Sequence, residues 1–394
     1  MIKTFVSQAQ SNLDQLIAWR RDFHQHPELA FAEQRSAKII SDTLGEMGLH
    51  VQTAIAETGV VGTLKGGKPG PTLLLRFDMD ALPIQEETGA VYASMQDGVM
   101  HACGHDGHMA IGLGVAQILS SQIQKLSGTI VFIFQPAEEG QGGAERMIAE
   151  GILEGLDASR SLGLHIWNEK PLHWLGITPG VVMAGSERFE IVVCGRGGHG
   201  ASPHLARDPV LTAAQLISTC QAITSRSLDP LEPGVVSFTV IEAGETWNVI
   251  PASVRLEGTI RTFSEASRMM VIERMKEISN GVCSAAGCQV KLAFERVTPP
   301  LVNDADTAAF AAEVAHQLFP AFEIDGEHRV MGSEDMAFFM QEVPGCYLFI
   351  GSSNSARNLD APHHNPRFDF DENALPIAAG LLAAIAWRLQ EKTS

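Results

Sequence analysis

Two apolar runs in this chain have the length of buried β-strands and end in acidic residues. The first run, residues 72–77, leads into Asp78 and Asp80, and the second, residues 128–134, leads into Glu138 and Glu139. Residues 161–165 resemble a third strand end, with His165 as the last residue. Continuous apolar runs are typical of strands covered on both faces of a sheet. Because open α/β sheets gather their active-site residues at strand ends, the chain is predicted to contain an α/β catalytic domain.

Helical periodicity indicates the elements around these strands. Residues 11–48 carry apolar residues at helical spacing, and Pro27, which interrupts them, is predicted to start a second helix. Residues 109–126 form a further helical stretch before the second strand. Alternating helices and strands of this kind are expected to cover a sheet with helices.

The pattern changes after residue 185. Residues 187–194, 235–241, 254–262 and 288–294 are predicted strands, and residues 206–224 and 265–286 are predicted helices. This β-α-β-β-α-β order is typical of a ferredoxin-like domain. We therefore expect a discontinuous catalytic domain of residues 1–185 and 296–394, interrupted by an inserted domain of residues 186–295.

Composition narrows the class of partner and the compartment. The 394 residues exceed the size at which one hydrophobic core stops growing. The net charge of −18 argues against a nucleic-acid or anionic membrane surface. No apolar run approaches the ~18 residues of a membrane span, and the first ten residues lack the apolar region of a signal peptide. The six scattered cysteines then predict reduced thiols and a cytoplasmic protein.

The segment His101-Ala-Cys-Gly-His-Asp-Gly-His108 places thiol and imidazole groups within eight residues. Zinc and similar borderline metals prefer these ligands, and compact Cys/His tracts are a metal-binding signature. The alternative interpretation is a polar turn with structural histidines. Further ligand-type residues stand in other loops, and their shared position at strand ends favours one joint site: Glu138, Glu139, His165, His363 and His364.

Adjacent glutamates suit a division of labour in which one binds metal and the other acts as general base. A solvated acidic loop is the alternative for this pair. The chain contains no Gly-x-Ser-x-Gly nucleophile elbow and no His-Glu-x-x-His helix. Cys103 as a catalytic nucleophile stays open at this stage, because a thiolate beside His105 suits a ligand equally well.

Several motifs in order along the chain resemble the amidohydrolase branch of the aminoacylase/carboxypeptidase dinuclear metallopeptidase superfamily. This branch includes hippurate hydrolases, N-acyl-amino-acid deacetylases and auxin-conjugate hydrolases. The matching segments are residues 21–29, 78–83, 100–108, 134–140, 197–204, 248–251, 258–261 and 331–335. The resemblance implies a zinc-peptidase-like α/β catalytic domain with an inserted ferredoxin-like domain that serves as lid and dimerisation domain.

The resemblance also implies roles for individual residues. Glu138 matches the general base, and Asp80 matches a carboxylate that orients a ligand histidine two residues earlier, although Asp78 occupies that earlier position here. Phe77 stands where a small residue is more common, which would narrow the pocket. The inserted domain's His199 matches a residue that reaches the partner subunit's site, and Asn248 and Arg261 match substrate contacts. The implied metal ligands are Cys103, as the bridge between two ions, with His105, Glu139, His165 and His364.

The resemblance implies hydrolysis of the amide bond of N-acyl amino acids by a homodimer or higher homo-oligomer. The implied cofactors are two divalent ions per subunit, for which zinc, manganese, nickel and cobalt all fit. Three other functions stay open: a dipeptidase or carboxypeptidase with the same centre, a thiol hydrolase using Cys103, and a non-catalytic binding protein. The remaining histidines are assigned to supporting or structural roles: His24, His26, His101, His108 and His204.

Overall fold

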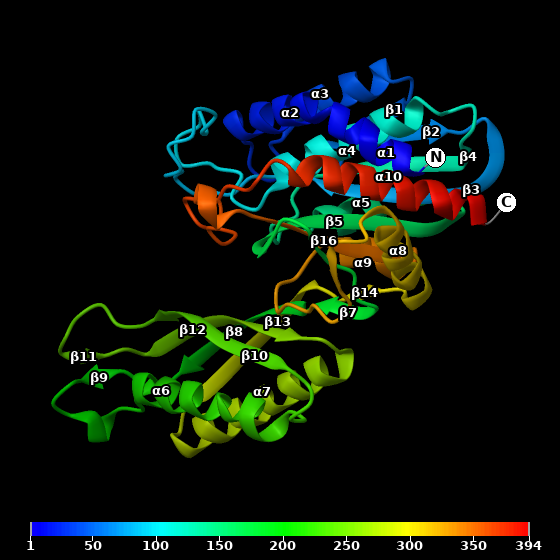
Figure 1. The fold of residues 1–394 in the computed structure, drawn as a ribbon. Coiled ribbons are helices and arrows are strands. Elements are labelled where there is room, and N and C mark those ends of the chain that lie inside the picture. Colours follow the sequence, from blue (N-terminus) through cyan, green and yellow to red (C-terminus); the bar gives the residue numbers. More distant parts are fainter. Residues whose placement is uncertain (1, 393–394) are drawn as a thin grey trace. The chain divides into compact units, whose positions relative to one another are not determined.

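The computed structural model describes residues 2–392, which form two compact units (Figure 1). The first unit comprises residues 2–182, 302–329 and 335–392, and the second comprises residues 183–301 and 330–334. The second unit therefore begins three residues before the predicted boundary at 186 and ends six residues after that at 295. It also takes in residues 330–334, which no periodicity in the sequence assigned to it.

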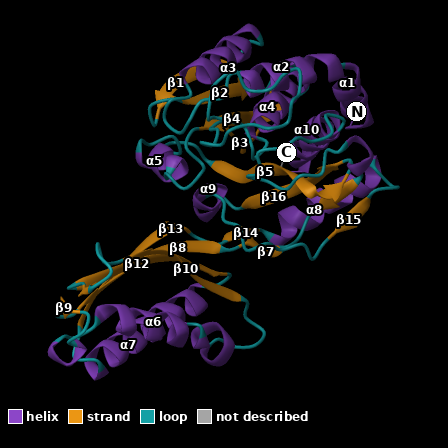
Figure 2. Cartoon of the chain, turned by 90° about the vertical axis from the view of Figure 1, so that its left-hand side faces the viewer, coloured by secondary structure: helices purple, strands orange, loops and turns teal. Residues whose placement is uncertain are grey.

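The first unit is built on an eight-stranded mixed sheet (Figure 2). Its four central strands, β4, β3, β5 and β16, are parallel to one another, so their carboxyl ends share one edge. In spatial order the strands are β1 (His50–Ile55), β2 (Gly59–Lys65), β4 (Ser127–Gln135), β3 (Lys68–Asp78), β5 (Ala158–Pro171), β16 (Gly345–Ser353), β6 (Trp174–Gly176) and β15 (Glu323–Asp325).

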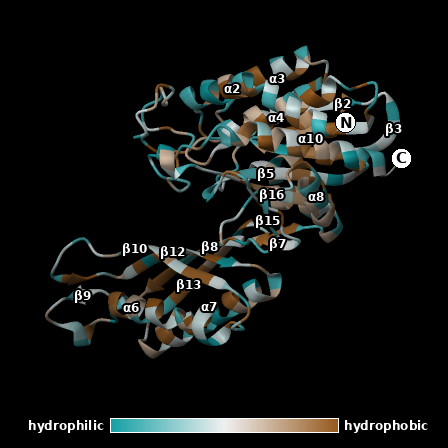
Figure 3. Cartoon of the chain, in the orientation of Figure 1, coloured by the Kyte–Doolittle hydropathy of each residue, from teal (hydrophilic) through white to brown (hydrophobic). Residues whose placement is uncertain are grey.

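Helices of the first unit cover this sheet (Figure 3), and the main apolar core lies between the sheet and all of these helices except the two short ones, Gly143–Ala149 and Met336–Glu342. The helices are α1 (Ile2–Ser11), α2 (Leu13–Gln25), α3 (Gln34–Glu46), α4 (His105–Ser120), α5 (Gly143–Ala149), α8 (Ala305–Leu318), α9 (Met336–Glu342) and α10 (Ala374–Lys392). Helix α4 is buried along nearly its whole length, as expected for a helix that is apolar on all sides. Gly112 lets α4 approach the sheet, because a Cβ there would lie 2.8 Å from the rings of Phe134 and Phe77.

Three details of the sequence prediction are wrong. Pro27 does not start a helix: the chain stays irregular until α3 begins at Gln34. Helix α4 begins at His105 rather than at 109, so two histidines of the metal-type segment lie in its first turn. His165 lies within β5 rather than at its end. It still reaches the site edge, because β3 is paired with β5 only as far as Arg76 and Gly163 and β5 continues beyond that point.

The second unit is an antiparallel sheet covered by two helices. Its strand order, β10-β12-β8-β13, together with the chain order β-α-β-β-α-β, is that of a ferredoxin-like fold. The elements are β8 (Gly185–Cys194), α6 (Pro209–Cys220), β10 (Gly234–Glu242), β12 (Ser253–Thr262), α7 (Glu265–Ala285) and β13 (Gln289–Thr298). A separate core of apolar side chains fills the space between this sheet and its helices.

Short elements complete the described chain. Two pairs of strands form small separate sheets: β7 (Gly180–Met183) with β14 (Leu301–Asn303), and β9 (Gly198–His199) with β11 (Val249–Ile250). Three single helical turns lie at Pro203–Leu205, Ile223–Ser227 and Ser355–Arg357. Among residues 2–392 no helix combines the length and apolar character needed to cross a membrane.

Candidate metal centre and active site

The first unit gathers thiol, imidazole and carboxylate groups at the carboxyl edge of its parallel strands. Ligand atoms of Cys103, His105 and His165 lie within 4.8 Å of one another, and so do those of Cys103, Glu139 and His364. His105 also groups with Glu138 and Glu139. The six residues come from four separate segments of the chain. Cys103, His105 and Glu139 each belong to two of these three groups, so the groups form one continuous cluster.

Backbone oxygens hold the Nδ1 atoms of two histidines, His105 and His165. His105 Nδ1 lies 2.8 Å from the backbone oxygen of Asp80, so Nδ1 carries the proton. Its Nε2 is buried and has no hydrogen-bond partner within residues 2–392. His165 Nδ1 likewise donates to the Ile166 oxygen at 2.6 Å, and its Nε2 lies 3.4 Å from the Cys103 Sγ. An Nδ1–H held by a protein oxygen, which leaves Nε2 as the nitrogen to face an ion, is the usual arrangement of metal-binding histidines.

His108 lies close to these groups but its ring is fully hydrogen-bonded. Its Nδ1 donates to Asp78 Oδ1 at 2.6 Å, and its Nε2 accepts the Ile166 N–H at 2.9 Å. The other oxygen of Asp78 accepts from Arg76 at 2.7 Å. Distance alone would allow Asp78, His105 and His108 to form a third ligand group. Because the atoms of Asp78 and His108 already bond to each other and to their neighbours, we assign these two residues a supporting role.

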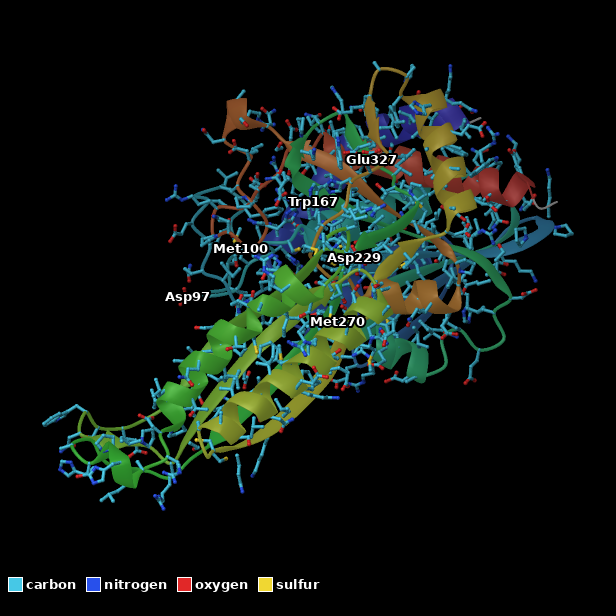
Figure 4. The ribbon with its side chains drawn as sticks, turned by 90° about the horizontal axis from the view of Figure 1, so that it is seen from below. Asp97, Met100, Trp167, Asp229, Met270 and Glu327 are labelled. Atoms are coloured by element: carbon cyan, nitrogen blue, oxygen red, sulfur yellow. The ribbon has the colours of Figure 1, made fainter. Side chains whose placement is uncertain are left out.

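The consecutive residues His363 and His364 differ in the same way. His363 Nε2 donates to the Ile166 oxygen at 2.9 Å, and its ring stacks on Trp167, which is labelled in Figure 4. His364 Nε2 lies 3.2 Å from Glu139 Oε1. The backbone of His364 adopts a φ of 64° and its N–H donates to the Ala102 oxygen at 2.8 Å. This bond ties the loop that carries His364 to the segment that carries Cys103.

Asp80 connects the Glu138–Glu139 pair to the histidine side of the site. Its two carboxylate oxygens accept the backbone N–H groups of Glu138 and Glu139, both at 3.0 Å. The carboxylate also lies 3.4 Å from His105 Nδ1. Glu138 Oε1 in turn accepts the Asp335 N–H at 3.2 Å. The carboxylate of Asp80 therefore fixes the backbone of both glutamates and lies beside the protonated nitrogen of His105.

The electrostatics of the site favour a bound cation. Burial and the carboxylates of Glu139 and Glu138 hold the pKa of the Cys103 thiol well above its ordinary value. Burial lowers the pKa of His105, but the carboxylates of Asp78 and Asp80 outweigh burial and raise it to about 10. A cationic metal would offset this excess of negative charge and allow Cys103 to ionise. Without a cation Cys103 stays a protonated thiol, which argues against its use as a catalytic nucleophile.

A buried ion pair supports the start of α4, and helical periodicity did not indicate it. Arg20 on α2 is fully buried and donates to Asp106 at 2.8 Å and to Asp369 at 2.7 Å. Asp106 follows the proposed ligand His105 directly. Buried charges are stable only when they are paired, so Arg20 and Asp106 hold this turn in place. In the sequence, the only sign of this ion pair is that Asp106 lies within the Cys/His segment. No local pattern indicates Arg20 as its partner.

Phe77 does not narrow a pocket. Its side chain is buried in the core, with its ring 5.4 Å from that of Phe134. The prediction was wrong because side chains alternate along β3: Phe77 points into the core, whereas Asp78 points to the opposite face. The site therefore receives Asp78 and Asp80 from this segment but not Phe77.

The second unit carries the other three predicted site residues, at two different places. His199 on β9 pairs with Val249 on β11, and the Gly200 N–H donates to the Asn248 oxygen, so His199 and Asn248 are neighbours. Arg261 lies on β12, eight residues beyond its first residue, Ser253, and hydrogen-bonds to Ser333. At ~3.3 Å per residue, Arg261 is roughly 25 Å along the strand from the end near β11.

One ring nitrogen of His199 already accepts a hydrogen bond, which leaves the other nitrogen to act as a donor. Its Nδ1 accepts the Ala201 N–H at 3.0 Å, and the residue is exposed. The proton of the neutral ring is therefore on Nε2, which is available as a hydrogen-bond donor. A ring oriented in this way suits donation to a developing oxyanion.

Comparison with known proteins decides the family. A model of Peptidase family M20/M25/M40 matches residues 74–388. This chain belongs to that family. It is 38% identical over 372 residues to the N-acetylcysteine deacetylase of Bacillus subtilis (strain 168), covering 94% of this chain and 96% of the relative. It is 37% identical over 384 residues to thermostable carboxypeptidase 1 of Saccharolobus solfataricus, covering 96% of both chains.

A solved structure agrees with these sequence relatives. The Bacillus subtilis YXEP protein, described as a dinuclear metal binding peptidase from the M20 family, superposes with a TM-score of 0.84 at 35% identity. The match covers 98% of this chain and all of the other. The M20 family member described here is therefore a metal-dependent hydrolase of amide or peptide bonds. Its fold is the one predicted, an α/β catalytic domain with an inserted ferredoxin-like domain.

Proposed function

We propose that this M20 protein hydrolyses the amide bond of N-acyl amino acids and releases a carboxylic acid and a free amino acid. The observation that carries the proposal is the pair Glu138–Glu139 beside the Cys/His groups. Glu139 lies within the ligand group of Cys103 and His364, and both glutamates lie within the group of His105. A ligand carboxylate next to a carboxylate available as base is what hydrolysis requires and what a binding protein has no need of.

The donor set fits two divalent ions. Cys103, His105, Glu139, His165 and His364 would hold them, and the buried, unpartnered Nε2 of His105 is oriented for this role. Such ions, when bound, supply a water of lowered pKa and polarise the scissile carbonyl. Thiolate, imidazole and carboxylate together accept zinc, manganese, nickel or cobalt, and availability decides among them.

The remaining chemistry belongs to side chains. Glu138 takes a proton from the attacking water and later delivers it to the leaving amine. The Asp335 N–H, 3.2 Å from Glu138 Oε1, helps to hold this carboxylate in place. His199 donates from Nε2 to the oxyanion of the tetrahedral intermediate, which is worth a few kcal/mol for a well-placed donor. Arg261 holds the free carboxylate of the amino-acid half with its guanidinium group.

The placement of Arg261 supports a homodimer. Asn248 and His199 lie beyond the start of β12, and Arg261 lies roughly 25 Å further along that strand, a distance far longer than an N-acyl amino acid. One substrate therefore cannot contact all three residues of one subunit, and Asn248 and Arg261 cannot share one carboxylate group. A partner subunit that supplies His199 and Asn248 resolves the conflict. Exposed apolar side chains of the second unit offer it a surface: Leu205, Val210, Leu211, Ile241, Trp247 and Val249.

A dipeptidase or carboxypeptidase is the second candidate, because a carboxypeptidase is among the relatives. It would use the same centre and differ in the group that occupies the acyl pocket. Turnover of N-acetyl, N-benzoyl and N-indoleacetyl amino acids, measured beside dipeptides, separates the two functions. We expect the acylated amino acids to be hydrolysed faster, and faster hydrolysis of dipeptides would favour the second candidate.

Metal dependence tests the centre itself. Dialysis against a chelator is expected to abolish amide hydrolysis, and Mn²⁺, Co²⁺, Ni²⁺ or Zn²⁺ is expected to restore it. Elemental analysis before and after dialysis gives the stoichiometry. Full activity in rigorously metal-free protein would contradict the proposal and return Cys103 to consideration as a nucleophile.

A further inference from the structure

The loop that carries Glu138 and Glu139 begins in an unfavourable backbone conformation. Ala137 has a φ of 54°, in the left-handed region where a Cβ clashes with the backbone. Residues held in this region persist only when their surroundings fix them. The N–H groups of the next two residues are fixed by Asp80. The N–H of Ala137 itself is fixed by a different carboxyl group.

That carboxyl group belongs to Glu33. Its Oε1 accepts the Ala137 N–H at 3.0 Å, and its Oε2 accepts the hydroxyl of Thr58. The side chain of Glu33 is completely buried. The Gly143 N–H closes the other side of the residue by donating to the Ala137 oxygen at 3.1 Å. Ala137 is therefore fixed through both its N–H and its carbonyl group.

The bond from Glu33 to Ala137 replaces the bond that a side chain at this position usually makes. Glu33 precedes α3 directly, where a polar side chain ordinarily accepts N–H groups from the first turn of its own helix. Its side chain makes no such bond. Glu28 does this instead, accepting the N–H groups of Arg35 at 2.9 Å and Ser36 at 2.8 Å. Glu33 is thus available for the loop that follows β4.

We propose that Glu33 is a positioning residue that keeps Glu138 and Glu139 in place by holding Ala137 in its left-handed conformation. The proposal rests on the roles proposed above for those two glutamates. Burial raises the pKa of Glu33 to about 7, so the group is largely neutral in mildly acidic solution. A glutamine at this position can therefore accept the same N–H and donate to Thr58, whereas an alanine can do neither.

The test compares three variants, metal-loaded for kinetics and metal-free for titration. Glu33→Ala is expected to lower kcat by about 10- to 100-fold, the scale of a small misplacement of catalytic groups, with KM changed less than ~3-fold. It is also expected to weaken metal binding about tenfold in calorimetric titration with Zn²⁺. Glu33→Gln is expected to stay within ~3-fold of wild type in both. Glu28→Ala, the matched control, removes two helix N–H contacts and is expected to lower thermal stability but to leave kcat within ~2-fold.

Ala137→Gly supplies the decisive readout, because glycine adopts a positive φ freely. Added to Glu33→Ala, it is expected to recover kcat by about fivefold over Glu33→Ala alone, which a purely structural role of Glu33 would not produce. Absence of that recovery, an equal loss in Glu33→Gln, or an equal loss in Glu28→Ala overturns the proposal.

A substitute variant covers a failure to fold, and a measurement without substrate covers a failure of the proposed function. If Glu33→Ala does not fold, as judged by circular dichroism, Glu33→Asp replaces it, because the shorter side chain withdraws the carboxyl group from Ala137. Zn²⁺ titration needs no substrate. A protein that hydrolyses no N-acyl amino acid but loses Zn²⁺ affinity in Glu33→Ala therefore contradicts the proposed function and supports the role of Glu33.

Discussion

Three buried histidines of the site, His105, His108 and His165, differ in which ring nitrogen is already bonded. His105 and His165 donate from Nδ1 to backbone oxygens, whereas His108 uses both nitrogens, for Asp78 and the Ile166 N–H. This difference, rather than distance, separates candidate ligands from supporting residues. It also explains why residue type alone could not rank the histidines of the 101–108 segment.

The two adjacent glutamates have separable roles. Glu138→Gln is expected to lower kcat by at least ~10²-fold and to leave metal content unchanged, because it removes only the base. Glu139→Gln is expected to weaken metal binding, because its carboxylate lies with Cys103 and His364. Steady-state kinetics with elemental analysis of both purified variants measures the two effects. Loss of metal in Glu138→Gln but not in Glu139→Gln would reverse the assignment.

Glu33 is expected to make the folded protein less stable as pH rises. An ion-paired carboxylate has the opposite effect. Burial raises its pKa in the folded protein from 4.5 to about 7. Between these values the unfolded chain has lost a proton that the folded protein keeps, so the free energy of unfolding falls as pH rises. The expected loss is about 3 kcal/mol, complete once the pH exceeds the folded value.

Glu33→Gln is expected to remove this dependence. Urea unfolding of both proteins at pH 5 and pH 8 should therefore show wild type losing about 2.5 kcal/mol more than the variant over this interval. An equal change in the two proteins would show that Glu33 ionises at its ordinary pKa in the folded state.

At the scale of elements, the turn between β4 and α5 has no room for a side chain where it enters the helix. Gly143 begins α5, and a Cβ on it would lie 1.8 Å from the backbone oxygen of Pro136. Backbone atoms cannot yield as a flexible side chain can. The close approach brings the start of α5 against the loop that carries Glu138 and Glu139, so packing and catalysis depend on the same turn.

Gly143→Ala is therefore expected to lower the free energy of unfolding by about 1–3 kcal/mol and to lower kcat at least tenfold. Gly281→Ala is the matched control, because this glycine lies inside α7 with no atom within 4 Å of the added Cβ. The control is expected to raise stability by up to about 1 kcal/mol without changing kcat. Denaturant unfolding and steady-state kinetics check both, and normal kcat in Gly143→Ala would contradict the coupling.

At the scale of the whole molecule, we expect a partner subunit to supply His199. The sheet of the second unit has open edges at β10 and β13, which favour pairing with another chain. A two-fold axis would make such an interface isologous. Each site would then contain Glu138 from one subunit and His199 from the other.

Mixing two inactive variants tests this arrangement. Glu138→Gln and His199→Ala subunits, after exchange verified by mass or by tag pull-down, are expected to regain activity in hybrids. One site of each hybrid then combines an intact Glu138 with an intact His199 supplied by the other subunit. Hybrids of Glu138→Gln with the double variant serve as the inactive control. No recovered activity in proven hybrids would place His199 in its own subunit's site or outside the reaction.

The sequence by itself determined the fold class and the candidate metal groups, because both rest on local patterns. Apolar runs of strand length predicted β3 and β4, and helical periodicity predicted α7 to within a residue of its ends. The Cys/His segment and the Glu138–Glu139 pair are short stretches whose residue types carry their chemistry without reference to the rest of the chain.

Only the tertiary structure decided the features that depend on residues far apart in the chain. The free nitrogen of His105 follows from its contact with Asp80, and the conformation of Ala137 follows from its contact with Glu33, 104 residues away. The same holds for residues 330–334, which join the second unit from a distant part of the chain. Hydrogen bonds and packing between such segments form only in the folded chain, so no local pattern records them.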